Sequence, residues 1–425
     1  MPHLLLLLAC LATVACAPPG AEVPGEAAQY QTDRAFRRAV LEEALWRPEL
    51  PYSQSLLSSY ALPAGGWDLL PLLDTRVAPF TRRDAEALAV GEALTLDDGV
   101  AIGAFAVEKG RDGSPRLSAA EAGPLGADLE AIGRRVFYTL PMRADRYLDW
   151  LAARPALWGE VGLPVQADGS VRGLVRFAEA DGTVRVGMAC GFCHGADGVD
   201  GRGERRLDLG RARALYAVAR GQAPTDEVPA ALAAWGPGHV DVTDGALDNP
   251  TVIPDLVGLS EARWINHSGV IRVTGRSTFA VRFETQYILG HRMVGRPDRA
   301  LMWALAAFVV GLGPEPTEPP EPTEPPAGAG VFEARCAGCH VPAWGYGGGL
   351  VPAEVLTSDA AVARDPERGT GSYRVPRLLG IGGRAPYLHD GSAATLDGLL
   401  AGGHPSGDVL PAADRAALID FLNTL

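Results

Sequence analysis

The sequence predicts a mainly α-helical protein with a few short β-hairpins, built from two domains of similar construction behind a helical N-terminal extension. Three observations support this fold class. The pattern Cys-x-x-Cys-His occurs twice, at 190–194 and at 336–340. A segment made almost entirely of Pro, Glu and Thr lies between the two copies, and a helix-spaced apolar segment follows each copy. At 425 residues the chain is long enough for two or three domains.

Composition excludes two broad classes of protein. Lys+Arg 38 against Asp+Glu 51 gives a net charge of −13, so the chain lacks the basic surplus that binding to a phosphate backbone requires. With 47% hydrophobic and 21% charged residues it also has ample material for a core. Nucleic-acid binding and wholesale disorder are therefore not expected.

The amino terminus predicts export. Residues 1–16 contain an apolar run that is too short to span a bilayer and is followed by small residues, as in a signal peptide. The end of this run, Thr13-Val-Ala-Cys16, resembles a bacterial lipobox, in which the cysteine carries the lipid; the alternative is an ordinary leader cut near Ala15 or Ala17. Residues 17–30 then form a flexible tether. We expect a protein on the periplasmic side of the envelope, attached to a membrane only through a lipid anchor.

The rest of the chain divides at the proline-rich linker, residues 313–327. Residues 31–130 predict an extension of helices and turns without a chemical motif, and 131–312 and 328–425 are the two domains. Each domain opens with a short helical stretch containing Gly and Phe, at 133–137 and 328–332, and closes with a helix, at 297–312 and 411–425. Alternation around Asp181-Gly182 predicts a β-hairpin over 171–188, just before the first motif.

Each Cys-x-x-Cys-His motif predicts a covalently bound haem c. Two thiols form thioether bonds to the porphyrin, and the adjacent His194 or His340 ligates the iron. A zinc ribbon needs a second cysteine pair roughly 15–20 residues on, which neither copy has. A redox dithiol would not explain a histidine after both pairs. Cys190 with Cys193, and Cys336 with Cys339, are therefore the expected attachment sites.

The second iron needs a distal ligand from a short list. None of the methionines lies after the linker, so the candidates are His389, His404, Tyr373 and Tyr387, or no ligand. His404 stands in Ala-Gly-Gly-His-Pro, a loop shortly before the closing helix that could fold over a haem. We therefore favour His404, against the alternative of a solvent-facing loop histidine.

For the first iron the distal candidates are His239 and His267, both in turn-rich segments, or no ligand at all. His291 follows an apolar run and is expected to be a packed or surface residue. Arg282 and Glu284 supply a cation and a carboxylate, the pair that a peroxidase needs beside an open iron to move the peroxide proton and ease O–O cleavage. The alternative is an exposed helical ion pair.

Two longer segments, Asp248-Asn-Pro-Thr-Val252 and Tyr373 to Leu396, resemble the bacterial di-haem cytochrome c peroxidase superfamily. The resemblance implies two cytochrome c-type haem domains with their haems close together. One haem relays electrons from a small donor protein, a cytochrome c or a cupredoxin, and the other meets peroxide or O2. The resemblance also implies calcium between the domains, with Asp248 as a possible ligand.

The sequence departs from this family at two places. The methionine that usually ligates the electron-transfer haem is replaced by Gly403 with His404 beside it, as in relatives that include rubber oxygenases, so the second haem should have a lower potential. His267 takes the place of a residue near both haems. The sequence thus predicts an exported di-haem peroxidase-like oxidoreductase; the alternatives are a pure electron-transfer cytochrome with both irons six-coordinate, and an oxygenase acting with O2.

Overall fold

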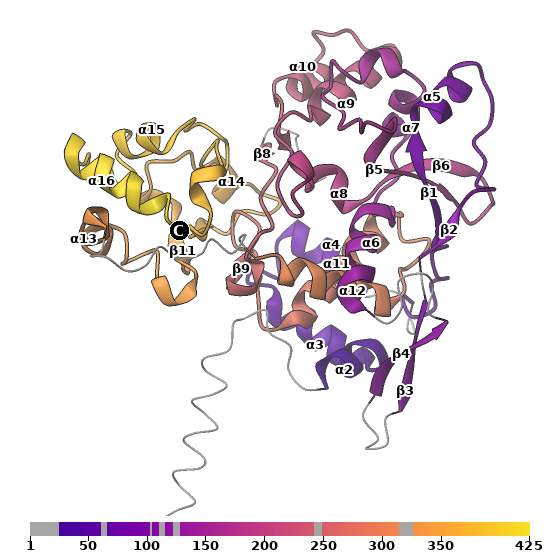
Figure 1. Cartoon of the computed structure of the whole chain (residues 1–425), viewed down its shortest axis with the longest axis horizontal. Helices are drawn as coiled ribbons and strands as arrows, with labels where there is room; N and C mark the ends of the chain where they lie inside the picture. Colours follow the sequence, from indigo (N-terminus) through magenta and orange to yellow (C-terminus); the bar gives the residue numbers. More distant parts are fainter. Residues whose placement is uncertain are drawn as a thin grey trace, which may run out of the picture.

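The computed structural model describes residues 25–60, 66–102, 104–109, 115–121, 128–241, 249–313 and 326–425. They form a larger body, up to residue 313, and a second unit, residues 326–425, that lies against one side of it (Figure 1). Both parts are mainly helical, which confirms the predicted secondary-structure class. The predicted signal peptide and nearly all of the predicted linker lie outside the described residues, as does most of the predicted tether.

Two helices that cross at close range organise the larger body. They are α6 (Leu129–Thr139) and α12 (Arg299–Gly311), the predicted opening and closing helices. Asp128 and Asp298 cap them by accepting backbone N–H groups of the first turn. The crossing needs a glycine, because a Cβ at Gly133 would lie 2.1 Å from the carbonyl oxygen of Ala304.

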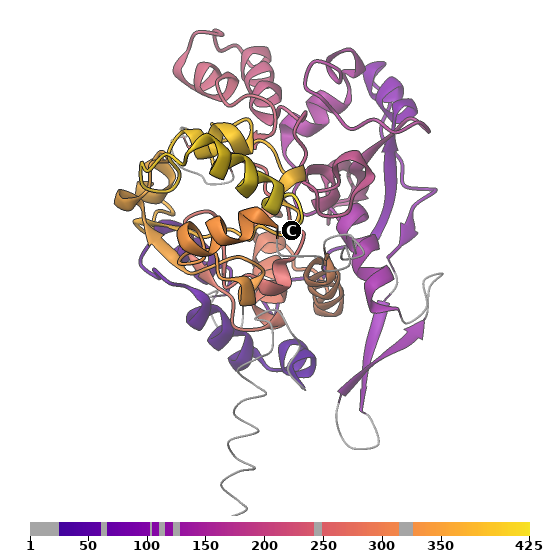
Figure 2. The ribbon, with the colours of Figure 1, turned by 60° about the vertical axis from the view of Figure 1, so that its left-hand side comes forward.

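A four-stranded antiparallel sheet, in the order β2-β1-β5-β6 with β2 at Val100–Ala101, lies on the side of the larger body away from the second unit (Figures 1 and 2). Strands β5 (Ser170–Ala178) and β6 (Val184–Met188) are the predicted hairpin, which is confirmed. Strand β1 (Arg76–Thr81) comes from the predicted extension and pairs along β5, with Val77 opposite Phe177. The extension therefore supplies an interior strand of this sheet.

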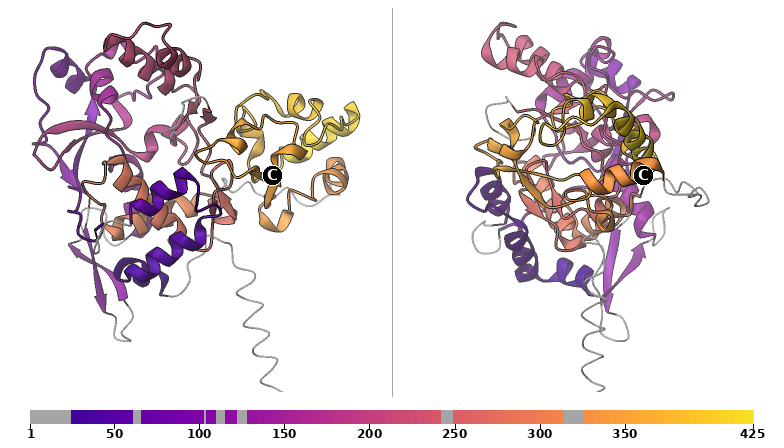
Figure 3. Two further views of the ribbon diagram at one scale, coloured as in Figure 1. Left: turned by 180° about the vertical axis from the view of Figure 1, so that it is seen from behind. Right: turned by 90° about the vertical axis from the view of Figure 1, so that its left-hand side faces the viewer.

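Three helices near the amino terminus pack on α11 (Arg276–Gly290), as the indigo segments in Figure 3 show. They are α2 (Glu26–Thr32), α3 (Arg34–Ala44) and α4 (Pro51–Ser58). Their buried side chains, Tyr30 and Leu41 among them, share one hydrophobic core with Phe279 and Trp303 of α11 and α12. Residues 31–130 thus pack as part of the same body as 131–312, because their apolar faces have no separate core to fill.

The second unit repeats the crossing of an opening and a closing helix. Helix α13 (Ala327–Arg335) packs against α16 (Ala412–Leu422), and a Cβ at Gly328 would lie 2.0 Å from the carbonyl oxygen of Ala417. The core between them is small and centres on Phe332 and Leu418. The same close approach at a glycine thus occurs in both halves of the molecule.

The remaining elements are short. In the larger body they are β2 (Val100–Ala101), α5 (Arg82–Ala89), β3 (Ala104–Lys109), β4 (Pro115–Glu121), α7 (Arg146–Ala152), α8 (Cys190–Cys193), α9 (Leu209–Ala219), α10 (Glu227–Ala233), β7 (His239–Val240), β8 (Thr251–Val252), β9 (Trp264–Ile265) and β10 (Ile271–Arg272). In the second unit they are β11 (Leu350–Pro352), α14 (Ala361–Arg364), β12 (Ser372–Arg374) and α15 (Leu396–Ala401). Within the described ranges, no helix has the length and apolar character to cross a bilayer.

Hydrogen bonds join the two parts through the loop between β9 and β10. The Ser268 hydroxyl donates to the carbonyl oxygen of Arg368 at 2.7 Å, and the Thr370 hydroxyl donates to the carbonyl oxygen of Ser268 at 2.6 Å. Nearby, the backbone N–H of Val252 donates to the carbonyl oxygen of His389 at 2.8 Å. These buried bonds fix how the two parts meet, since breaking them would leave polar groups without partners.

Candidate functional site

The first Cys-x-x-Cys-His motif forms helix α8 and the residue after it, directly behind the β5–β6 hairpin. Glycines make room for this packing. A Cβ at Gly173 of β5, whose φ is +71°, would lie 2.1 Å from the backbone nitrogen of Phe192. The ring of Tyr138 occupies the space beside Gly191, where a Cβ would be 2.2 Å away. The hairpin and α6 thus hold the motif from both sides.

The ring of His194 is tethered through one nitrogen. Its Nδ1 lies 3.0 Å from the carbonyl oxygen of Pro254, which fixes the ring orientation and leaves Nε2 to act as a ligand. Burial lowers the pKa of His194 to about 4. The imidazole is therefore neutral at physiological pH, which is the form that binds a metal.

The second motif has the same arrangement. His340 follows α13, and its Nδ1 lies 2.9 Å from the carbonyl oxygen of Tyr346. Burial again lowers the pKa of this histidine. Cys336 is half-buried and Cys339 is exposed. In both motifs a backbone carbonyl thus holds Nδ1 of the histidine.

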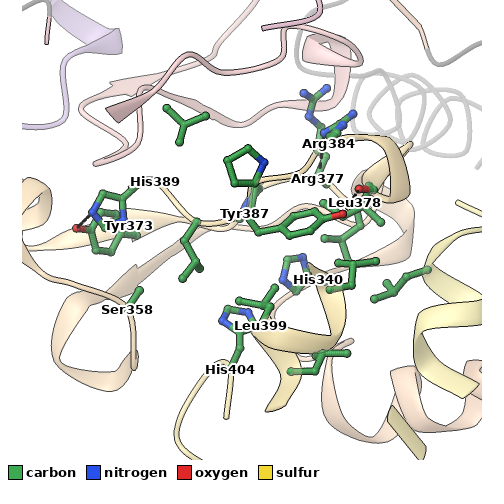
Figure 4. Close-up of a pocket in the computed structure, with 18 of the residues that line it drawn as sticks. His340, Ser358, Tyr373, Arg377, Leu378, Arg384, Tyr387, His389, Leu399 and His404 are labelled. Atoms are coloured by element: carbon green, nitrogen blue, oxygen red, sulfur yellow. Dashed lines mark hydrogen bonds between the residues drawn. The ribbon is translucent and has the colours of Figure 1, made fainter. Parts of the chain in front are cut away.

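A cavity of about 250 Å³ opens beside the second motif (Figure 4). Cys336 and His340 lie on its wall, and much of the remaining lining is apolar. The apolar side chains come from the core of the second unit and from the loops beside it: Phe332, Leu356, Leu378, Ile381, Leu396, Leu399, Leu400, Leu418 and Leu422. This is the lining that a large, flat, mostly apolar group requires.

His404 lies in the same cavity as His340 (Figure 4). The turn that brings it there follows α15 and contains Gly403, whose φ of +80° favours glycine. Burial, and then the nearby charge of His340, lower the pKa of His404 to about 4. Within the described part of the chain, no hydrogen-bond partner engages its ring. His404 therefore presents its ring to the cavity that His340 also lines, and its role as a distal ligand stays a prediction.

The other candidates for the second iron are occupied. The rings of Tyr373 and His389 stack with their centroids 4.6 Å apart, and the Tyr373 hydroxyl lies 3.2 Å from Nε2 of His389. The Tyr387 hydroxyl donates to the carbonyl oxygen of Ile381 at 3.1 Å. These contacts favour His404 over all three.

Two histidines considered near the first motif are engaged elsewhere. The two ring nitrogens of His239 lie 2.9 Å and 3.1 Å from the carbonyl oxygens of Pro237 and Asp390. His291 places Nε2 2.8 Å from the carbonyl oxygen of Pro141, which agrees with the expectation of a packed residue. Both ring nitrogens of His239 are thus engaged, whereas His291 is held through Nε2 alone.

His267 lines the cavity of the second unit, rather than a site of the first motif alone. Its ring centroid is 6.3 Å from that of His389, and its Nε2 is buried without a hydrogen-bond partner. Burial, with the nearby charge of Arg374, lowers the pKa of His267 to about 3. His267 is therefore a neutral histidine at the face between the two parts. The sequence predicted that it would lie near both haems.

The structure does not pair Arg282 with Glu284, which corrects the prediction of a joint proton-handling pair. The Glu284 carboxylate is fully buried and accepts hydrogen bonds from Arg299 at 3.0 Å and from the Tyr30 hydroxyl at 3.0 Å. Arg282 instead lies over the ring of Tyr52, 5.8 Å from its centroid. The two side chains leave α11 in different directions, so the alternative of an exposed ion pair is also wrong.

Sequence reasoning missed several residues at these sites. The cavity is lined by three arginines that sequence reasoning did not single out, Arg374, Arg377 and Arg384. Their occurrence together in the Tyr373–Leu396 segment is the sequence feature that could have pointed to them. The hydroxyls of Tyr30 and Tyr60 contact Glu284, and neither gave a sequence signal. Tyr30 lies in the predicted flexible tether, which the structure corrects, because residues 26–30 belong to helix α2 and the Tyr30 side chain is fully buried.

The calcium ligand proposed from the sequence, Asp248, lies outside the described residues. Its neighbour Asn249 donates from Nδ2 to Asp365 across the face between the two parts, at 2.8 Å. Among the residues that the structure describes, no three Asp, Glu, His or Cys side chains are grouped so as to hold a metal ion.

Comparison with known proteins gives distant matches only. No family model matches the chain, and neither does any curated protein sequence. One similar structure is hydrazine synthase of Kuenenia stuttgartiensis under xenon pressure, with a TM-score of 0.33 and 16% identity, covering 44% of this chain and 76% of that chain. Another is a MauG-like protein associated with microbial copper homeostasis, with a TM-score of 0.31 and 19% identity, covering 41% of this chain and 73% of that chain. At these TM-scores, assignment of function depends on the residues themselves.

Proposed function

We propose that the protein is an exported di-haem c-type cytochrome that acts as a peroxidase-like oxidoreductase. One observation carries the proposal. In both Cys-x-x-Cys-His motifs, a backbone carbonyl holds the histidine Nδ1, and burial keeps the ring neutral. That is the arrangement of a proximal iron ligand.

The residues fit a covalently bound haem. Two cysteines at each motif provide thiols for thioether bonds, and when bound the haem supplies a redox-active iron. At the second motif the fit is closest, because an apolar cavity contains Cys336, His340 and His404 together. Apolar walls exclude water from the group that these side chains hold.

The two sites offer different donor sets, which supports a division of labour. The second site has a histidine from the motif and His404 in the same cavity, a donor set that suits electron relay. At the first site, His239 and His291 are held by carbonyl oxygens and His267 lines the other cavity. An open position there is what binding of peroxide or O2 requires. An electron-transfer cytochrome is the alternative if both irons are six-coordinate.

The proposal includes a location and a partner. Export by residues 1–16 and lipidation at Cys16 would attach the protein to a membrane on the periplasmic side. A small soluble cytochrome c or cupredoxin would then deliver electrons to the second site.

The test is to produce the protein together with c-type cytochrome maturation enzymes. We expect two haems per chain that survive denaturation, and a half-reduced state in which one haem is high-spin and reacts with peroxide. Two low-spin haems without peroxide reactivity would select the electron-transfer alternative. Protein that binds zinc and no haem would refute both.

A further inference from the structure

Four arginine side chains line the cavity of the second unit. Arg374 and Arg377 follow one another at the end of β12 and just beyond it, Arg384 follows in the next loop, and Arg205 reaches in from the larger body. Figure 4 shows Arg377 and Arg384 on the same side of the cavity, near His340 and Tyr387. Buried positive charges of this kind are stable only when negative groups lie beside them.

Among the residues that the structure describes, few carboxylates lie beside these arginines. Arg205 and Arg384 share the carboxylate of Asp255, at 3.4 Å and 3.7 Å. Arg374 and Arg377 have no ion pair and no side-chain hydrogen bond within the described ranges. The buried atoms left without a partner are Nε of Arg374, Nε and Nη1 of Arg377, and Nη2 of Arg384.

Such an arrangement is costly unless an anion completes it. A buried charge without a partner loses its hydration and gains no compensating attraction. Burial lowers the pKa of Arg374 to about 10, and burial together with the nearby Arg384 lowers the pKa of Arg377 well below its usual range. Arg377 is only 4% exposed, so bulk solvent offers its guanidinium group little compensation.

We propose that Arg374, Arg377 and Arg384 bind the propionate carboxylates of the haem attached at Cys336, Cys339 and His340. This inference rests on the proposed function, because it takes the haem in that cavity as given. Guanidinium groups present paired N–H donors that match carboxylate oxygens, and a haem carries two such carboxylates on one edge. The guanidinium groups that line the cavity then become the donors of that site.

A redox consequence follows. With Arg205 included, four arginines lie against two propionates and Asp255, so one positive charge remains near the second iron and favours its reduced form. It opposes the low potential that two histidine ligands impose. The arginines are thus positioning and tuning residues, and their effect is separable from any turnover.

The experiment measures the midpoint potential of the second haem in the two-haem protein by spectroelectrochemistry. In Arg374→Gln and Arg377→Gln we expect the reduction equilibrium constant to fall by about tenfold each, which is about 59 mV for a one-electron couple. Arg377→Lys, which keeps the charge, should retain most of the wild-type potential. Arg415→Gln is the matched control, because Arg415 pairs with Asp397 outside the cavity and its loss should leave the potential unchanged.

The outcomes separate the possible sources of the carboxylate. If free anions fill the site, added phosphate or citrate would shift the potential of the wild type but not of Arg377→Gln, and the propionate assignment is overturned. Equal potentials in wild type and both glutamine variants would also overturn it, while two covalent haems would still stand. Loss of haem from the wild type would instead refute the proposed function itself.

Discussion

The two Cys-x-x-Cys-His units use one structural plan at very different scale. In each, an opening helix crosses a closing helix at a glycine, Gly133 over Ala304 and Gly328 over Ala417. The first unit is embedded in a core that the N-terminal residues help to build, whereas the second has a core of few buried side chains and a cavity at its centre. The two units therefore share the helix crossing at a glycine and the histidine held through Nδ1. They differ in the size of the core around these features.

This difference in core size should determine how much the stability of each unit depends on its bound haem. The larger body has an extensive core of buried side chains around α6, α11 and α12. The second unit surrounds a space that its own side chains do not fill. We therefore expect the second unit to need haem for its stability much more than the first.

The largest expected effect comes from removing each cysteine pair. Cys190→Ala with Cys193→Ala, and Cys336→Ala with Cys339→Ala, should each remove one covalent haem, as measured by intact mass. Only the second change should also make its unit sensitive to proteolysis, because the cavity would then be empty. Equal protease resistance of the two variants would contradict the difference drawn between the units.

The next largest effect is the spectroscopic change expected from His404→Ala. Removing the distal donor should convert one low-spin haem into a high-spin or water-ligated form, visible in the electronic absorption and EPR spectra. His239→Ala serves as control, because both of its ring nitrogens face carbonyl oxygens. If the His404 variant keeps the wild-type spectrum, the ligand must be sought at His389 or a tyrosine.

The shared crossing can be tested by adding one methyl group. Gly328→Ala should cost roughly 3 kcal/mol, the upper part of the usual range for overpacking, because the new Cβ meets a backbone carbonyl oxygen. Gly330→Ala on the same helix meets nothing within 4 Å and should be neutral or stabilising by up to about 1 kcal/mol. Chemical denaturation of the second unit measures both, and similar stabilities of the two variants would argue against a tight crossing.

The smallest effect concerns pH at the face between the two parts. The pKa of His267 is lowered to about 3, so the unfolded chain binds a proton there at a higher pH than the folded chain does. Stability should therefore be complete above about pH 6.5 and decrease as the pH falls toward 3. In His267→Gln this decrease should be shallower, as judged from denaturation curves at pH 7, 5 and 4. A slope identical to that of the wild type would show that His267 is not among the groups responsible.

Local patterns predicted much of this architecture. The hairpin at 171–188 followed from alternation about Asp181-Gly182, and the opening and closing helices followed from apolar spacing. The loop that carries His404 followed from its glycines and its place before the last helix. Each of these depends on interactions between residues close in the chain.

Long-range contacts were not predictable in the same way. The sequence around Val77 does not predict that this residue lies opposite Phe177. Likewise, the sequence around Tyr30 does not predict a hydrogen bond to Glu284. The pairing predicted between Arg282 and Glu284 failed for the same reason, since Arg299 and two tyrosines from distant segments take the carboxylate. Sequence spacing placed both residues on α11 but could not say what each one faces.

The position of β1 in the sheet limits how the chain can be shortened. Residues 76–81 cover one long side of β5, and without them that strand would present unpaired N–H and C=O groups to solvent. A fragment beginning at residue 131 would contain both haem motifs and yet carry an exposed strand edge, the surface through which separate chains pair into aggregates. Shortened forms of this protein must therefore begin before Arg76 to keep this edge of β5 paired.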